Sequence, residues 1–209
     1  MLSLFFEVEI KPGRTDQYLN LAAALKGDLE AMGGCLFLDR FKSLSRDNVI
    51  LSYQIWQDEG SLTAWRVQAH HHEVQTLGRD RVFTDYRIRV AQVVYEERRG
   101  EPVVQPDWRT HYNDPARRAP AYVLATESKR ATLPAACEWP GEAFASVYRD
   151  GQFAHLVALP DHQSGVAFAP RLFDEPTTDY VRIVEVVRDY GMYDRAEAPQ
   201  FYPPKRRDA

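Results

Sequence analysis

Residues 48–95 read NVILSYQIWQDEGSLTAWRVQAHHHEVQTLGRDRVFTDYRIRVAQVVY, and this stretch decides the fold. Its first part, residues 48–56, is rich in β-branched and aromatic side chains, which predicts a strand. Asp58 is a suitable N-cap for a helix that follows this strand. Residues 83–95 again favour a strand, because they form a long run of Ile, Val and Tyr broken by single polar residues. The stretch therefore predicts strand, helix and strand in succession.

The helix in this stretch has one apolar face. Leu62, Trp65, Ala69 and His72 recur at helical spacing, and Gly78 is placed to end the helix. On a continuous helix Trp65 and His72 are seven residues apart and point within about 20° of the same direction. We therefore expect both to face the sheet.

The residues before this stretch supply the other half of the unit. Residues 4–10 (LFFEVEI) alternate as a strand does, and an amphipathic helix is expected from about Arg14. Gly33 and Gly34 stop that helix, and residues 35–43 (CLFLDRFKS) extend as a strand. The predicted order is β-α-β-β-α-β, the ferredoxin-like unit of α+β proteins.

The remaining residues predict a second, degenerate copy of the same unit. Residues 96–120 hold four prolines and many charges, which is typical of a connector. We expect residues 1–95 to form the first unit and residues 121–195 the second, with a tail over 196–209. In the second unit the first helix is expected to be cut down to about residues 131–140.

Two such units can close into one barrel. A four-stranded ferredoxin-like sheet covers one face with its helices and leaves the other face bare, so that this bare face has to find a partner. A tandem copy provides that partner within one chain. The predicted fold is therefore an α+β barrel made of two ferredoxin-like units.

The face turned away from the helices carries charge. Phe5, Glu7 and Glu9 share this face of the first strand, while Arg87 and Arg89 share it on the fourth strand. Because these two strands are neighbours in the ferredoxin-like order, Glu7 and Glu9 are expected to oppose the two arginines. A solvated sheet face with salt bridges would show the same pattern.

The third strand is expected to contribute to the same face of the sheet. Ser52, Gln54 and Trp56 lie on one face of it and mix polar with aromatic character. Together with the charged pairs they suggest the wall of a polar-lined cavity.

Composition excludes several classes of protein. The chain has 209 residues, 44% of them hydrophobic, and a net charge of −4 that is evenly spread, which argues against nucleic-acid binding. No apolar run reaches the roughly 18 residues of a membrane span, so that no membrane association is expected. Two cysteines do not make a disulfide framework, which favours a reducing, cytoplasmic setting.

Three adjacent histidines, His70, His71 and His72, are the clearest candidates for chemistry. Neighbouring helical positions point about 100° apart, so the three cannot all face one metal ion, and no metal site is expected. A single inward histidine can be a core residue, a proton-transfer group or a haem ligand. No nucleophile elbow, dinucleotide or P-loop motif is present.

These residues resemble a known family. The spacing of Trp56 and Trp65, the histidines that follow, Gly78-Arg79 and the strand FTDYRIRVA at residues 83–91 are similar to the antibiotic biosynthesis monooxygenase (ABM) superfamily. The resemblance covers residues 2–95 well and the C-terminal part in outline.

The resemblance implies a dimeric α+β barrel, used by many members for oxygenation of aromatic polyketides or quinols without a cofactor. Related members bind and degrade haem through a histidine on the second helix, helped by a tryptophan and a first-strand asparagine. Trp65 matches the tryptophan, and His71 or His72 matches the histidine. The asparagine is absent here, because Phe6 or Glu7 stands in its place, which argues against haem degradation.

The first functional hypothesis is a cofactor-independent monooxygenase acting on a planar aromatic or quinol. His72 or His71 would transfer the proton, next to Trp65. The substrate would contact side chains of the sheet, with an arginine stabilising a developing oxyanion; these are Phe5, Glu7, Gln54, Trp56, Arg87 and Arg89.

Two alternatives stay open from the sequence. One is a non-catalytic protein that binds or senses a small molecule on the same barrel, and the other is a haem protein. A homodimer is also expected, on the ground that the shortened second unit leaves an odd strand edge.

Overall fold

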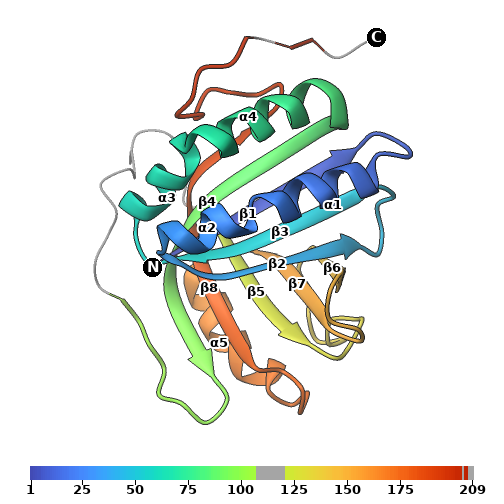
Figure 1. Cartoon of the computed structure of the whole chain (residues 1–209). Helices are drawn as coiled ribbons and strands as arrows, with labels where there is room; N and C mark the ends of the chain where they lie inside the picture. Colours follow the sequence, from blue (N-terminus) through green and yellow to red (C-terminus); the bar gives the residue numbers. More distant parts are fainter. Residues whose placement is uncertain (107–120, 204, 207–209) are drawn as a thin grey trace.

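A computed structural model describes residues 1–106, 121–203 and 205–206 of the chain. Within these ranges eight strands and five helices follow one another, with a π-helical turn, η1, before the fourth strand (Figure 1). Each of the two helices predicted in the first unit is divided into two, α1 with α2 and α3 with α4. Their bounds are β1 Leu2–Ile10, α1 Thr15–Ala24, α2 Lys26–Met32, β2 Cys35–Ser43, β3 Val49–Trp56, α3 Glu59–Val67, α4 Ala69–Leu77, η1 Gly78–Val82, β4 Phe83–Arg98, β5 Ala121–Ser128, β6 Gly141–Ser146, β7 Phe153–Leu159, α5 His162–Leu172 and β8 Tyr180–Gly191.

The first unit forms as its sequence predicts. Asp58 caps α3, because its side chain accepts a hydrogen bond from the backbone N–H of Ser61 at 2.7 Å. Gly33 ends α2 with a φ of 70°, a conformation that costs glycine little. Strand β4 runs on to Arg98, and Glu96 also forms a β-bridge with Val104. The beginning of the expected connector is therefore part of the sheet, and the rest of it from 107 onward lies outside the described residues.

The second unit is more reduced than expected. Residues 131–140 form turns and bends, and the short helix predicted there is wrong. Pro134 and Pro140 lie in this stretch, and proline removes a backbone donor that a helix needs. The hairpin of β6 and β7 does form, with Gly151 at its turn in the left-handed region at a φ of 67°.

The two units close into one barrel, which confirms the predicted fold class. The strand order around the barrel is β1-β3-β2-β6-β7-β5-β8-β4. The units join along a long antiparallel pairing of β4 with β8 and a short pairing of β2 with β6. Each of the eight described strands therefore has a neighbour on both sides. The free strand edge from which a homodimer was expected does not exist here, and the dimer itself remains a prediction.

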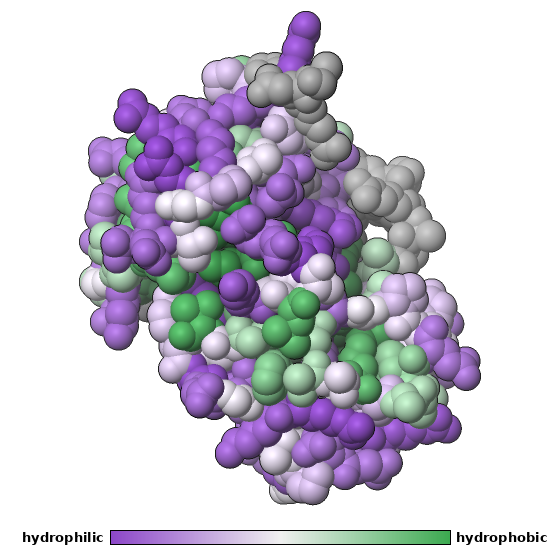
Figure 2. Space-filling view, turned by 90° about the vertical axis from the view of Figure 1, so that its right-hand side faces the viewer, coloured by the Kyte–Doolittle hydropathy of each residue, from purple (hydrophilic) through white to green (hydrophobic). Residues whose placement is uncertain are grey.

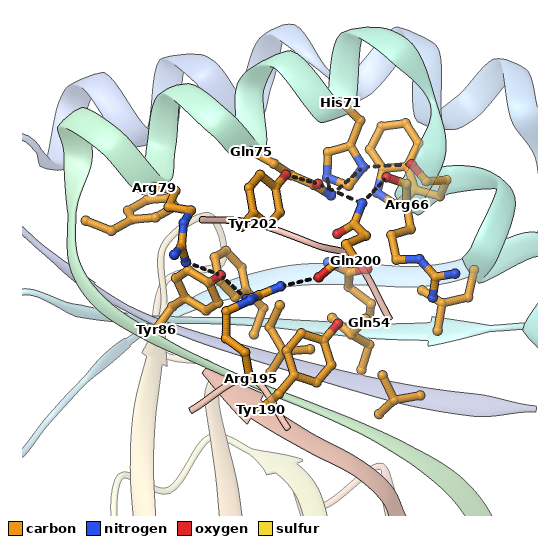
Figure 3. Close-up of a pocket in the computed structure, with 17 residues that line it drawn as sticks. Gln54, Arg66, His71, Gln75, Arg79, Tyr86, Tyr190, Arg195, Gln200 and Tyr202 are labelled. Carbon is orange, nitrogen blue, oxygen red and sulfur yellow. Dashed lines mark hydrogen bonds between the residues drawn. The ribbon is translucent and has the colours of Figure 1, made fainter. Parts of the chain in front are cut away.

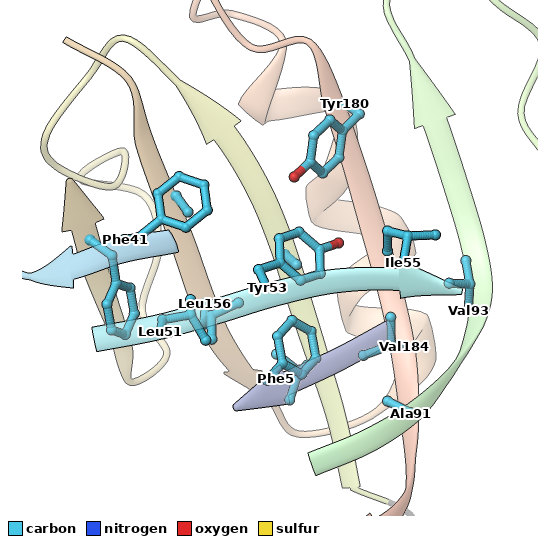
Figure 4. Close-up of a cluster of buried hydrophobic side chains, with 14 residues drawn as sticks. Phe5, Phe41, Leu51, Tyr53, Ile55, Ala91, Val93, Leu156, Tyr180 and Val184 are labelled. Carbon is cyan, nitrogen blue, oxygen red and sulfur yellow. The ribbon is translucent and has the colours of Figure 1, made fainter. Parts of the chain in front are cut away.

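The barrel interior is a hydrophobic core to which every strand contributes (Figure 4). Phe5 of β1 stacks on Tyr53 of β3, with ring centroids 5.1 Å apart. Val93, Leu156 and Val184 approach from the other strands. Alternation then places the neighbouring residues of each strand on the outside of the barrel, under the helices.

Helices cover the outside of the sheet in both units (Figure 1). On the face shown in Figure 2, hydrophilic residues dominate the upper part, and hydrophobic residues show through between them. Among the described residues no helix combines the length and the hydropathy that a bilayer crossing requires.

The two units differ in how closely their helices approach the sheet. Helix α5 lies directly on the second unit because Gly165 has no side chain: a Cβ there would lie 2.5 Å from Leu159 Cδ1 and 2.9 Å from Ile183 Cδ1. Phe168 and Leu172 fill the contact. In the first unit, α4 stands away from the sheet, and a cavity lies beneath it.

Candidate active site

Two adjoining cavities lie between the helices and the outer face of the sheet in the first unit. The smaller has a volume of about 120 Å³ and lies under α4 and the segment after β8 (Figure 3). The larger, of about 700 Å³, extends under α1 and α2 toward β2. Six residues line both cavities and so mark where they meet: Phe6, Gln54, Trp65, His71, Gln75 and Phe83.

A break in the second helical region brings His71 to this junction. Gln68 adopts a φ of −59° and a ψ of 132°, which ends α3, and its side chain caps α4 by accepting from the backbone N–H of His71. The bend lets the His71 ring stack on Trp65 with centroids 4.1 Å apart and planes 18° apart. The expectation that Trp65 and His72 share one face is wrong, because it assumed one continuous helix.

His71 is held as a neutral base. Its Nδ1 lies 2.8 Å from the carbonyl oxygen of Trp65, which can only accept, so Nδ1 carries the proton and Nε2 keeps its lone pair. Burial lowers the pKa of His71 to about 4, and the bond to Trp65 opposes this only in part. The amide nitrogen of Gln75 lies 3.3 Å from Nε2. At neutral pH the ring is therefore uncharged and able to accept a proton.

The two neighbouring histidines point elsewhere. His72 is exposed, and its ring stacks on Tyr202 with centroids 5.7 Å apart. His70 is also exposed, and its Nδ1 lies 2.6 Å from the carboxylate of Asp28. Over the ranges that the structure describes, no three His, Cys, Asp or Glu side chains gather as metal ligands would.

Four of the predicted substrate-contacting residues belong to the barrel side of the sheet and lie away from both cavities. Phe5 is completely buried in the barrel core. Arg89 forms an ion pair with Glu7 at 2.6 Å, as the charge pattern predicted, whereas Glu9 lies opposite Asp85 and not opposite an arginine. Arg87 pairs instead with Asp189 of β8 at 2.6 Å. Closure of the barrel takes this face away from any substrate under the helices.

The third strand shows the opposite error. Ser52, Gln54 and Trp56 face the helices, because Leu51, Tyr53 and Ile55 are the residues of this strand that enter the barrel core. Gln54 therefore lines both cavities, whereas the fully buried Trp56 donates its indole N–H to Gln54 Oε1 at 2.9 Å. The amide nitrogen of Gln54 donates a hydrogen bond to Ser52 Oγ at 3.1 Å.

The sequence also left part of the wall unnoticed. The smaller cavity is bordered by three arginines, Arg66, Arg79 and Arg195, and by Tyr86, on which two of them converge. Arg79 and Arg195 donate to the Tyr86 hydroxyl at 3.1 Å and 2.8 Å. Tyr86 directly precedes Arg87 in β4, so alternation puts it on the helix side, and this signal could have found it.

The C-terminal segment, residues 192–203, borders the smaller cavity, and its Gln200 and Tyr202 lie between α4 and the sheet (Figure 3). Gln200 donates to the backbone carbonyl of Arg66 at 3.1 Å, and Tyr202 donates to Gln75 Oε1 at 3.1 Å. Because Gln75 Oε1 accepts this bond, the amide nitrogen of Gln75 is turned toward His71. The segment thus fixes the polar groups around the histidine.

The corresponding position in the second unit is filled. The cluster of Leu124, Val157, Phe168 and Ile183 occupies the space between α5 and the sheet. His155 of β7 is buried there and 2% exposed. The two cavities described above both lie in the first unit.

His155 makes stability depend on pH. Burial lowers its pKa to about 4 from 6.5, although backbone carbonyls of Arg130 and Ala131 oppose this. Between these pH values the unfolded chain binds a proton that the native state does not, so the free energy of unfolding falls as the pH drops from 6.5 to 4, by at most about 3 kcal/mol. His155→Leu should flatten this part of the profile, measured by urea unfolding at a series of pH values. A profile as steep as that of the wild type would contradict this assignment.

Comparisons with known proteins identify the family of the chain. The chain matches the family described as "Antibiotic biosynthesis monooxygenase" over residues 1–77. A protein of Pyricularia oryzae named "Jasmonate monooxygenase ABM" is 35% identical, over 98% of this chain and 99% of its own.

Solved structures are similar at lower identity. One described as an antibiotic biosynthesis monooxygenase aligns with 45% of this chain and 99% of its own, at 21% identity and a TM-score of 0.41. One from Lactobacillus acidophilus aligns with 90% of this chain and 94% of its own, at 7% identity and a TM-score of 0.43. The identity with the Pyricularia oryzae protein extends over both units and is the stronger finding. On that ground the chain belongs to the antibiotic biosynthesis monooxygenase family.

Proposed function

We propose that this protein is a monooxygenase that oxidises a small cyclic substrate in the cavities at His71, without a prosthetic group. The observation that supports this most is the neutral His71 at the junction of the two cavities, with Nε2 free to accept a proton. Such a base can remove a proton from a methylene beside a carbonyl group, or from a phenol, and leaves an electron-rich anion.

That anion can itself reduce dioxygen. In the overall reaction a CH₂ group and O₂ give C=O and H₂O, so the substrate supplies all four electrons and no external reductant is needed. Gln54 uses one amide hydrogen for Ser52 and has a second to donate to the developing oxyanion. Trp65 and Phe6 supply the apolar wall.

Two kinds of substrate meet these requirements. One is a planar aromatic with an activated methylene, or a quinol. The other is a cyclic ketone such as jasmonate, the compound in the name of the Pyricularia oryzae relative. Both present an acidic hydrogen next to an apolar ring.

The surroundings of His71 leave the lone pair of Nε2 open. Trp65 covers one face of the ring, and the Gln75 amide nitrogen lies 3.3 Å from both ring nitrogens, which places it off the axis of this lone pair. A substrate hydrogen can therefore reach Nε2, and on this ground we assign His71 to proton transfer. Haem ligation is the alternative that a haemin titration tests.

Oxygen uptake tests the proposal. Purified protein should consume oxygen with jasmonic acid or with anthrone, without added reductant, at one molecule of O₂ for each molecule of product. Saturable quenching of tryptophan fluorescence without oxygen uptake would identify a binding protein instead. A Soret band at one equivalent of added haemin, lost on His71→Ala, would identify a haem protein and overturn the proposal.

A further inference from the structure

The smaller cavity has an unbalanced charge. Three guanidinium groups line it, those of Arg66, Arg79 and Arg195, and none of the described residues that line it is an aspartate or a glutamate. The rest of the wall is largely apolar or aromatic. Positive charge next to apolar surface is costly unless an anion neutralises it.

Arg79 and Arg195 donate their hydrogen bonds to uncharged groups. Besides the Tyr86 hydroxyl, Arg79 donates to the carbonyl oxygens of Met192 and Pro203 at 3.2 Å and 2.8 Å. Arg195 donates to those of Gly191 and Gln200 at 3.2 Å and 2.8 Å. These bonds fix the two side chains in place, and no ion pair joins either arginine to a carboxylate of the described residues. Their role is to hold the C-terminal segment and to make the cavity positive.

Arg66 is different, because one buried donor of its guanidinium group has no partner among the described residues. Its Nε is buried and has no hydrogen-bond partner within the described part of the chain. A buried donor without a partner costs free energy that a ligand acceptor would recover. Tyr190, which is 7% exposed, lines the same end of the cavity, and Arg66 is among the cations that act on its hydroxyl (Figure 3).

We propose that this end of the cavity binds the carboxylate of the substrate, with Arg66 as the direct contact, and that the substrates are therefore small apolar monocarboxylic acids. The inference rests on the proposed function for the position of the reacting ring. His71 and Arg66 line the same cavity, so an acid held by Arg66 extends its apolar body along Leu4 and Val90 toward the histidine. The guanidinium fork matches the two oxygens of a carboxylate.

Binding of acids and of their methyl esters separates this inference from the oxidation chemistry. The probes are jasmonic acid and decanoic acid, each with its methyl ester, titrated by calorimetry under anaerobic conditions. The wild type should bind at least one acid about 10- to 100-fold more tightly than its ester, the range expected for a hydrogen-bonded charge pair. Arg66→Met should reduce this ratio to about 1 and leave ester binding unchanged.

Two further variants serve as controls for the Arg66→Met result. Arg66→Lys retains the charge and should restore part of the preference for the acid. Arg81→Met removes an exposed arginine next to the site and should leave the ratio as it is in the wild type. Thermal melting of each variant establishes that it is folded.

The outcomes of the two proposals are distinguishable. No binding of any probe, or a wild-type ratio near 1, or a ratio that Arg66→Met leaves unchanged, would overturn the carboxylate site. Acid binding through Arg66 without oxygen uptake would support the carboxylate site and contradict the oxygenase reaction. Oxygen uptake with anthrone but no preference for acids would support the oxygenase reaction and contradict the carboxylate site.

Discussion

His71→Ala is expected to lower kcat/KM for oxygen uptake by at least about 100-fold, because a positioned general base contributes roughly 10²- to 10⁴-fold. His71 is the histidine of the triplet that lines both cavities, and its pKa of about 4 keeps it in the base form above about pH 5. The measurement is oxygen uptake with an electrode at several substrate concentrations.

Two matched variants come from the same helix. His70→Ala and His72→Ala remove exposed rings that contact Asp28 and Tyr202, so both should keep activity within about threefold of the wild type. His71→Ala should still bind the substrate, because Arg66 and the apolar wall are unchanged. Full activity in His71→Ala, or a loss confined to His72→Ala, would contradict the assigned role.

Glu96→Ala is expected to lower the free energy of unfolding by about 3–5 kcal/mol, the usual cost of removing one partner from a buried ion pair. Glu96 of β4 lies directly opposite Arg182 of β8, where the two units join, and accepts from its Nε. Arg182 is 3% exposed, and its charge also lies over the ring of Tyr180 at 4.0 Å. Without Glu96 this charge stays buried and unpaired.

Arg98→Ala is the control for this prediction. Arg98 also pairs with Glu96, at 2.7 Å, but its side chain is 41% exposed. Exposed pairs contribute about 0–1 kcal/mol, so this variant should lose less than about 1 kcal/mol. Urea unfolding measures both. Equal losses in the two variants would contradict the view that the pair with Arg182 holds the units together.

The sequence predicted the fold because its signals there are local. The alternation of β1, the Asp58 cap and Gly33 each depend on neighbouring residues, and each is confirmed. Alternation also predicted that Phe5 and Glu7 would lie opposite the helix face. The short helix predicted at residues 131–140 does not form, because the second unit covers that part of its sheet with turns.

The site was harder to predict because distant contacts decide it. Nothing in the type of residue at Gln68 indicates a helix break, since it is neither glycine nor proline. The break is stable because the backbone carbonyls it frees find other partners: that of Trp65 accepts from His71, and that of Arg66 accepts from Gln200. Gln200 lies 134 residues away from Arg66 in the chain. Helical periodicity could not include such a contact, and it therefore aligned His72, rather than His71, with Trp65.

The C-terminal segment illustrates the same limit. Its sequence near Tyr202 has no periodicity, and the expected tail over 196–209 gave no reason to place it at the first unit. Its position depends on Arg79 and Arg195, which lie far apart in the chain and meet at Tyr86. The gathering of Arg66, Arg79 and Arg195 at the smaller cavity could therefore be recognised only from the three-dimensional structure.

Isotope labelling tests the central claim, oxidation of a small substrate by dioxygen at His71, most directly. The wild-type protein is incubated with jasmonic acid or anthrone under ¹⁸O₂ in ordinary water, and the mass of the product is determined by mass spectrometry. The account predicts one ¹⁸O atom in each molecule of product, and no such product with His71→Ala. Product whose new oxygen comes from water, or substrate recovered unchanged with both compounds, would contradict it.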